Sequence, residues 1–548
     1  MLFIGVAVLG LSVLSANLLS SSRIVEPPSA AAIIESDHFQ QTVAAVDQEF
    51  REHLRVLETE SAPPADYATI ARRLSLALTG TIPSFEELRA LKEMPEQQRT
   101  QWWVSRLLND RRSADYLAER FARSYVGTQN GPFIVYRRRR FVTWLGNQLQ
   151  ENRRYDELVR ELISDTGLWT DSPAVNFLTV TLDENGDGRP DPIRLAARTS
   201  RAFLGMRIDC LQCHDDKLGN VWLGDEDAQR DGEQADFHRL AAFYSEAQSS
   251  LLGLKDDDSD YKYQYLDAEE EEVVPPQVPF NGGLLETLPL DEETATRREL
   301  LARWVTHPNN KPFARATVNR VWALMFGRPL VEPVDDIPLH GDYPPGLETL
   351  ADAFVKADYD LKWLIRVIAS TEVFQRDSRA DFEVTDKHEL RWAVFPLTRL
   401  RPEQVAGSMI QAASLKTIDS QSHIIVQLTR FGQQNDFIQR YGDMGEDEFD
   451  DRGGTVTQRL LLMNGQLTRE RTTDNPFMNA ASRIATLAPT DEKAVETAYL
   501  AVLSRRPSSD ELGHFVGHIQ GKKGAERQRC LEDLYWVLLN STEFSWNH

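Results

Sequence analysis

The segment DCLQCHDD, from Asp209 to Asp216, has two cysteines and a histidine spaced for covalent haem chemistry. In a C-x-x-C-H run, the thiols of Cys210 and Cys213 can add across the two vinyl groups of one haem while His214 reaches the iron. The same spacing occurs in redox or disulfide-bonded cysteine pairs and in half of a zinc site. No second C-x-x-C pair occurs in the chain. Haem c attachment is our first hypothesis; a disulfide or redox pair and a metal or structural role are the alternatives.

A haem with two axial ligands needs a second side chain on the far side of the iron. No methionine occurs between His214 and Met325, although Met206 lies just upstream of the motif. The nearest downstream histidine is His238, in ADFHRLAAFY, and it is our candidate for the sixth iron ligand. A helix-surface role for His238 and a five-coordinate haem are the alternatives.

The segment DENGDGRPDP places oxygen-bearing side chains two residues apart, as in a calcium-binding loop. Asp183, Asn185, Asp187, Gly188 and Asp191 fall at positions one, three, five, six and nine of an EF-hand-like pattern. Position twelve is Arg194 rather than the bidentate glutamate of a true EF-hand. We therefore predict either a calcium site or a turn that tolerates positive φ at this loop.

Other catalytic motifs are absent from the sequence. The chain has no G-x-S-x-G, H-E-x-x-H, G-x-x-x-x-G-K-[ST] or G-x-G-x-x-G pattern. His340 and Asp342 lie in PLHGDYPPG, a proline-rich segment that is typical of a loop. Whether the protein is an enzyme is not decided by its sequence, and no catalytic residue is assigned.

The elements around the motif have helical periodicity. Ile70, Leu74 and Leu78 form one apolar stripe, which ends at Gly80. A second helix is predicted after Pro83, because Ser84 followed three residues later by Glu87 is a capping box.

A further helix is predicted immediately before the motif. The segment DPIRLAARTSRAFLGMRIDC has a helix-like apolar stripe that ends near Gly205. The motif is therefore expected to follow a helix and to open a loop.

The fold class that we predict is mainly α, with two helix-rich domains joined by an acidic, proline-containing linker that holds a small β element. YKYQYL and EEVVPPQVPF are the candidate strands of the linker, and their prolines confine them to edges. The predicted segments are residues 1–22, a membrane anchor or signal; 23–45, a tether; 46–250, a domain with the motif; 251–292, the linker; and 293–548, a second helical domain.

The first nineteen residues, MLFIGVAVLGLSVLSANLL, carry no charged side chain and are long enough to cross most of a bilayer as a helix. They lack a basic stretch at the start, and Leu14 stands where a cleavage site after Ala16 would need a small residue. We therefore predict an uncleaved anchor in preference to a cleaved signal peptide. Either segment would place the body on the periplasmic or cell-surface side of a membrane.

Composition limits the partners. The 548 residues have 41% hydrophobic and 26% charged side chains, which is typical of globular domains, and the net charge is −23. So acidic a chain disfavours nucleic acid, because binding phosphates needs a basic surface. There are three cysteines, so Cys530 has no nearby partner and is predicted to be a small buried apolar residue.

Two halves of the chain resemble known domain families. The first half resembles the cytochrome-type domain of unknown function 1549, best known from planctomycetes, in YATIARRLSLALTGTIPSFEELRAL, SRAFLGMRIDCLQCHDD and DFHRLAAFY. The second half resembles its usual C-terminal partner, the domain of unknown function 1553, in RRELLARWVTHPNNKPFARATVNRVWALMFGRPLVEPVDDI, LRPEQVAGSMIQAAS and AVETAYLAVLSRRPSSDEL. The resemblance covers the chain from about Val46 to His548.

The resemblance implies an exported bacterial protein whose Cys210, Cys213 and His214 are taken as a haem c signature. Relatives commonly read C-x-x-C-H-D-H-P, whereas this chain has Asp216 at the second histidine. Asn319, Arg320 and Trp322 match the strongest motif of the partner domain. They either bind a ligand or have a structural role, in which Arg320 bridges helix carbonyls and an acid such as Asp335.

These observations favour an exported, membrane-tethered c-type haem protein with an electron-transfer or redox role and an unidentified redox partner or surface ligand. The alternative is a haem-free cell-surface binding or scaffold protein with a Cys210–Cys213 disulfide and a calcium loop.

Overall fold

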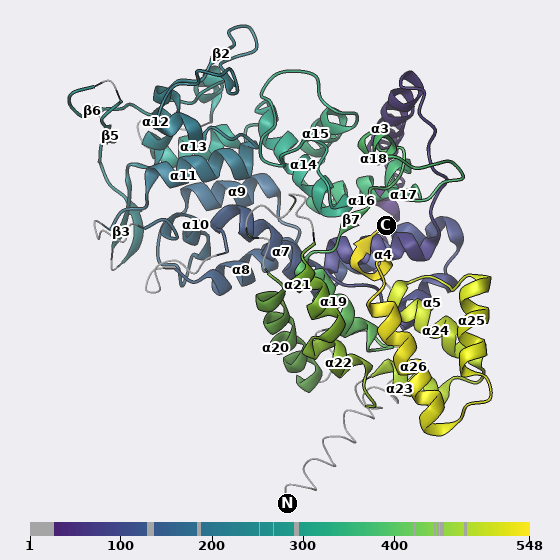
Figure 1. The fold of residues 1–548 in the computed structure, drawn as a ribbon. Coiled ribbons are helices and arrows are strands. Elements are labelled where there is room, and N and C mark those ends of the chain that lie inside the picture. Colours follow the sequence, from purple (N-terminus) through teal and green to yellow (C-terminus); the bar gives the residue numbers. More distant parts are fainter. Residues whose placement is uncertain are drawn as a thin grey trace, which may run out of the picture.

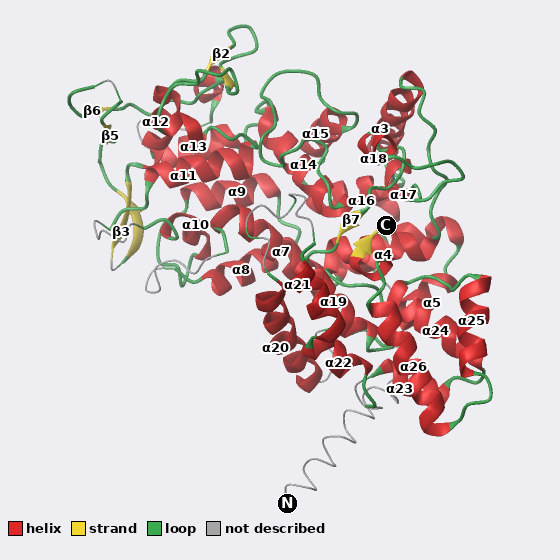
Figure 2. Ribbon diagram, in the orientation of Figure 1, coloured by secondary structure: helices red, strands yellow, loops and turns green. Residues whose placement is uncertain are grey.

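The structure is a computed structural model, and it describes residues 27–128, 136–182, 188–250, 252–266, 268–289, 295–419, 422, 424–442, 445, 449, 454–475 and 479–548. The protein is mainly helical, with 59% helix and 5% strand, which confirms the predicted fold class (Figure 2). The predicted N-terminal anchor, residues 1–22, lies outside the described residues. Among the helices that are described, none has the length and apolar character needed to span a bilayer.

The first part of the chain is a series of helices. They are α2 (Ala31–Ile34), α3 (Asp37–Val56), α4 (Tyr67–Thr79), α5 (Phe85–Glu93), η1 (Glu96–Gln98), α6 (Arg99–Asn109), α7 (Arg111–Val126), α8 (Arg138–Gln150) and α9 (Tyr155–Ser164). Helix α4 ends at Gly80, whose φ of 64° is the left-handed conformation that glycine adopts without steric cost. Helix α5 begins with the predicted capping box, in which Ser84 and Glu87 each bind the backbone N–H of the other. Both sequence predictions are confirmed.

The motif follows a second group of short helices. They are η2 (Pro173–Val175), α10 (Asn176–Thr179), α11 (Pro192–Thr199), the π-helical turn η3 (Ser200–Leu204), the 3₁₀ turn η4 (Asp209–Gln212), α12 (Gln234–Ala241) and η5 (Ala242–Tyr244). The helix predicted before the motif is α11, extended by η3 and ended by Gly205 at φ 63°. The motif opens directly after this stop, as predicted.

Three small hairpins lie at the same end of the molecule as α12 (Figure 1). Their strands are β1 (Trp222–Leu223) with β2 (Arg230–Asp231), β3 (Ala247–Ser250) with β4 (Gly253–Asp256), and β5 (Lys262–Tyr263) with β6 (Glu272–Val273); η6 (Gly282–Thr287) follows. The β element predicted in the linker is the β5–β6 pair, in which Tyr263 lies opposite Glu272. This hairpin brings the alternating tyrosines of YKYQY to the motif.

The second half is again helical. Its elements are α13 (Arg297–Val305), α14 (Lys311–Phe326), α15 (Leu347–Lys356), α16 (Leu361–Ser370), α17 (Glu372–Gln375), α18 (Asp386–Leu390), β7 (Thr398–Arg399), α19 (Pro402–Ala412), α20 (Ile424–Tyr441), α21 (Val456–Asn464), α22 (Gln466–Thr472), α23 (Ala480–Leu487), α24 (Asp491–Leu503), α25 (Ser509–Ile519), α26 (Gly524–Leu539), η7 (Glu543–Ser545) and β8 (Trp546–Asn547). Strand β8 pairs with β7, so two segments about 150 residues apart lie side by side.

Two hydrophobic cores divide the molecule between Phe395 and Leu400. The first core takes buried side chains from the N-terminal helices, from the predicted linker and from the helices up to Phe395. The second core takes its side chains from Leu400 onward, together with Leu76 and Ile82 of the first half. The packing boundary therefore differs from the compositional boundary at 251–292, and the domain limits drawn from the sequence stay predictions.

Helix α14 connects the second half to the motif. A Cβ atom on Gly205 would lie 3.1 Å from the Cβ of Ala316, so the glycine lets η3 approach α14 closely. Further along α14, Trp322 stacks on Phe50 of α3 and on Phe326, with ring centroids 5.7 and 4.3 Å apart. The segment before the motif is thus packed against a helix that is buried along almost its whole length, from Pro312 to Phe326.

Candidate functional site

The C-x-x-C-H motif forms one exposed turn. Leu211 is fully buried within η4, while Cys210, Cys213 and His214 are all exposed. The N–H of Cys213 donates to the carbonyl oxygen of Cys210 at 3.2 Å, which closes the turn. One inward apolar side chain therefore anchors a turn that presents both thiols and the imidazole to solvent.

The ring of His214 has a defined orientation. Its Nδ1 lies 2.7 Å from the carbonyl oxygen of Asp215. Because a carbonyl oxygen only accepts, Nδ1 carries the proton in the neutral ring and Nε2 keeps its lone pair. A metal-binding histidine usually has this kind of second hydrogen bond. His214 is therefore arranged to bind a metal through Nε2.

The carbonyl oxygen of Gln212, between the two cysteines, accepts from three side chains. His238 Nε2 and Gln234 Nε2 each lie 3.0 Å from it, and the hydroxyl of Tyr263 lies 3.3 Å away. These donors come from α12 and from the β5–β6 hairpin. The backbone at the centre of the motif is thus held by two elements that follow it in the chain.

His238 lies beneath this turn and is fully buried. Its Nδ1 is 2.9 Å from the hydroxyl of Tyr261, so both ring nitrogens have partners. Burial lowers the pKa of His238, so the ring is neutral. His238 would have to leave one of these partners to bind iron, and its role as sixth ligand stays a prediction.

Asp216, where relatives commonly have a second histidine, organises the loop that follows the motif. Its carboxylate accepts from the N–H of Val221 at 2.6 Å and of Leu218 at 3.0 Å. The backbone hydrogen bond from Val221, with those of its neighbours, lowers the pKa of Asp216. The aspartate therefore holds residues 216–221 as a closed loop in this protein.

Residues of the second half contact the chain on both sides of the motif. Before it, Asp335 accepts from Arg207 at 2.8 Å and the N–H of Ile337 donates to the carbonyl of Gly205 at 2.7 Å. After it, His340 Nε2 lies 3.0 Å from the carbonyl oxygen of Gly224. One loop of the second half therefore brackets the motif segment.

The partner-domain motif supports this loop. The carboxamide of Asn319 accepts from the N–H of Val331 and donates to the carbonyls of Val331 and Val334 at 2.9 to 3.2 Å. Asp335 pairs with Arg207 rather than with Arg320, so the contact considered from the sequence is corrected. The two side chains that pair with Asp335, Arg207 and Arg201, both come from the first half, which sequence spacing could not indicate.

The predicted calcium loop is described only in part. Asp183, Asn185 and Asp187 lie outside the described residues. Asp191 caps α11 by accepting from the N–H groups of Ile193 and Arg194, and Leu182 and Pro190 form a bridge at the base of the loop. The calcium site stays a prediction.

No group of three or more His, Cys, Asp or Glu that could hold a metal ion occurs among the described residues. His514 and His518 have the H-x-x-x-H spacing of half a zinc site, but they lie on α25, beside the second core. The structure therefore does not bring a second pair of zinc ligands to Cys210 and Cys213.

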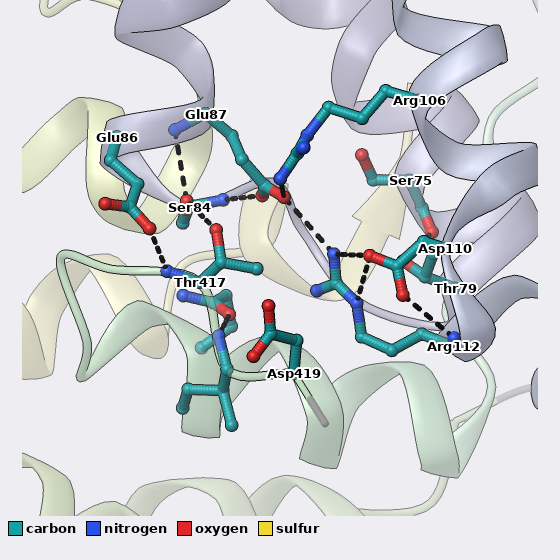
Figure 3. A network of polar contacts seen from close by, with 12 residues as sticks. Ser75, Thr79, Ser84, Glu86, Glu87, Arg106, Asp110, Arg112, Thr417 and Asp419 are labelled. Carbon is teal, nitrogen blue, oxygen red and sulfur yellow. Dashed lines mark hydrogen bonds and ion pairs between the residues drawn. The ribbon is translucent and has the colours of Figure 1, made fainter. Parts of the chain in front are cut away.

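A separate polar cluster lies where α5, α6 and α7 meet the segment before α20 (Figure 3). The Glu87 carboxylate, 2% exposed, accepts from Arg106 and Arg112 at 3.3 and 3.2 Å. Arg112 also binds Asp110 at 2.7 Å, and Glu86 accepts from the N–H of Thr417 at 2.8 Å. These carboxylates all have cationic or backbone partners, which is typical of a structural ion network.

Each half of the chain matches the model of a known protein family. Residues 45–249 match the model of PSCyt2, a protein of unknown function (DUF1549), and residues 297–436 match that of PSD1, a protein of unknown function (DUF1553). PSCyt2 is named as a planctomycete cytochrome-type family. No curated protein and no solved structure matches the chain.

Proposed function

This chain joins a PSCyt2 domain to a PSD1 domain, and on that premise we propose that it is an exported c-type haem protein with an electron-transfer or redox role. Cys210 and Cys213 would hold the haem through thioether bonds, and His214 would bind the iron through Nε2. When bound, the iron supplies exchange of a single electron.

The observation that carries the proposal is the geometry of the turn. Two thiols and an imidazole stand exposed on one turn, with the His214 tautomer already set for metal binding. Two exposed apolar side chains, Leu218 and Trp222, follow in the sequence, 83% and 50% exposed. Exposed apolar side chains a few residues after the motif suit a flat, largely apolar ring.

The properties of Cys210 argue against a thiol-disulfide enzyme. Although Cys210 is exposed, the protein atoms around it displace some water, and this desolvation, together with the negative charges of Asp216 and Asp209, raises the pKa of its thiol. Reactive cysteines of redox enzymes have a lowered pKa and an electropositive environment. A cysteine that is held in a thioether bond needs neither a lowered thiol pKa nor an electropositive environment.

His214 is the protein ligand that we assign to the iron. Because both nitrogens of His238 have partners, we propose that this histidine does not bind the iron. We also propose that residues 1–22 anchor the body on the periplasmic or cell-surface side, where it meets its redox partner.

The test is the mass and spectrum of the full chain, produced with its N-terminal segment in a bacterium that carries a cytochrome c maturation system. A mass increase equal to one haem and a pyridine haemochrome spectrum with the bands of two thioether bonds are expected. A matured protein with the mass of the bare chain would contradict the proposal. A mass lower by two hydrogens would instead identify the disulfide of the alternative scaffold function.

The calcium loop is tested separately. Calcium titration of the purified protein is expected to give saturable binding that the pair D183N and D187N abolishes, because carboxylates are the main calcium ligands. Equal heats for the variant and the parent would exclude this site.

A further inference from the structure

The strongest constraint on the motif is the set of three donors at one backbone oxygen. A carbonyl oxygen has two lone pairs, so donors from His238, Gln234 and Tyr263 leave the Gln212 oxygen with no capacity for another partner. Gln212 separates the two cysteines, so any rotation of this peptide moves one thiol relative to the other. The hydrogen bonds to the Gln212 carbonyl therefore help to set the distance between the two thiols to which haem would be attached.

His238 is the most constrained of the three donors. Its ring stacks on Tyr263 with centroids 3.4 Å apart and an interplanar angle of 21°, and it meets Tyr265 edge-on at 5.7 Å. Tyr261 binds its Nδ1 at 2.9 Å. A ring in contact with these two tyrosines and bound at both nitrogens has one orientation, with an Nε2–H group directed at the Gln212 carbonyl.

The hairpin supplies these tyrosines by its alternation. Tyr261, Tyr263 and Tyr265 are two residues apart, so they lie on one face of an extended strand. Pairing with β6 sets the register at Tyr263 and Glu272. The β5–β6 hairpin thus sets the orientation of the His238 ring, and this ring holds the Gln212 carbonyl of the motif in place.

We propose that His238 is a positioning residue for haem attachment, which acts through the Gln212 carbonyl and not as an iron ligand. The proposal rests on the proposed function for its biological meaning. The preorganised turn keeps Cys210 and Cys213 exposed on one surface before haem arrives, and it leaves His214 as the protein ligand to the iron.

The test compares H238F with H238Q and H340F. Phenylalanine keeps an aromatic ring against Tyr263 but has no donor, whereas glutamine restores an N–H group. H340F is the matched control, because His340 also binds a backbone carbonyl, that of Gly224 beyond the motif. The readouts are amide hydrogen exchange of residues 209–214 in the haem-free protein, and the haem content and visible spectrum of the matured protein.

In H238F we expect exchange of residues 209–214 to become about tenfold faster, the change that loss of one net hydrogen bond allows. Haem content should fall, while the haem that is attached keeps the parent spectrum. H238Q should recover most of the protection, and H340F should leave it unchanged. Unchanged exchange in H238F, or conversion of a six-coordinate parent spectrum to a five-coordinate one, would overturn the inference.

A second variant and the haem content of the parent protein show how to read the outcome for His238. If H238F does not fold, Y263F removes one donor to the same carbonyl and should increase exchange of the same residues in the same direction, by a smaller factor; unchanged exchange in Y263F would also overturn the inference. If the parent protein takes up no haem, the proposed function fails, while the exchange measurement still decides whether His238 positions the turn.

Discussion

The motif turn and the ion network of Figure 3 differ in how their polar side chains are used. In the network, Glu87, Arg106, Arg112 and Asp110 neutralise one another inside the protein. At the motif, the buried donors are directed at one backbone carbonyl, and the cysteines and His214 face solvent. The polar groups of the network therefore hold helices together. At the motif, buried side chains bind the backbone, so that the thiols and the imidazole stay exposed to solvent.

The largest expected effect is at the motif itself. Replacing Cys210 and Cys213 together by serine should abolish covalent haem, because both thioether bonds are lost. Both side chains are exposed, so the thermal midpoint of the haem-free protein should stay that of the parent. Intact mass and a thermal melt measure the two quantities, and retention of covalent haem would contradict the assignment.

The next largest effect is expected in the ion network. E87Q removes the carboxylate charge that faces Arg106 and Arg112 and weakens the capping box of α5. Breaking a buried pair leaves its partner uncompensated, so the free energy of unfolding should fall by about 3 kcal/mol. Urea unfolding measures the loss. E52Q, in an exposed pair with Arg55, is the control and should leave the unfolding curve unchanged.

A smaller effect, with a pH signature, is expected at Asp110. Burial would raise the pKa of this carboxyl, but the charge and hydrogen bonds of Arg112 outweigh burial and lower it. Its contribution is therefore complete above the ordinary carboxyl pKa and is lost as the pH falls through the lowered pKa. D110N keeps a good helix cap and should cost about 1 kcal/mol at neutral pH.

Urea unfolding at pH 7 and pH 3 checks this prediction. The difference between D110N and the parent should shrink at the lower pH, because the carboxyl of the unfolded chain, with its ordinary pKa, is then largely protonated. An equal difference at both pH values would show that Asp110 acts as a cap alone.

The smallest effect is expected where the second half brackets the motif. D335N weakens the ion pair between the buried Asp335 and the partly exposed Arg207, but the asparagine oxygen can still accept from Arg207, so we expect a loss of about 0.5 kcal/mol. Exchange of residues 205–209 should increase slightly, and haem attachment should persist. D342N, at an exposed position in the same loop, is the control. Complete loss of haem in D335N would mean that the second half takes a direct part in the site.

The local features of this protein were predictable from neighbouring residues. The stop at Gly80, the capping box of Ser84 and Glu87, and the helix before the motif that ends at Gly205 are all present as predicted. Each depends on residues within about one helical turn, so the sequence contains the whole interaction. The C-x-x-C-H turn is predictable for the same reason.

The contacts that hold the site were not predictable in this way. Gln212 meets Gln234 and Tyr263 across 22 and 51 residues, and Arg207 meets Asp335 across 128. The alternation in YKYQY indicated that its tyrosines share a face, but not what that face covers. Sequence distance makes His238 a candidate iron ligand, but only the structure shows that its two nitrogens lie beside the Gln212 carbonyl and the Tyr261 hydroxyl.

The amino-acid sequence by itself therefore determined the helices, the turn with its two thiols and imidazole, and the acidic character that disfavours nucleic acid. Only the tertiary structure shows which side chains hold the turn, where the two cores divide, and which groups Asp216 and His238 contact. The physical reason is the separation of the partners along the chain. Turns and helix caps form between residues a few positions apart, whereas a buried donor acquires its partner only when the whole chain has packed.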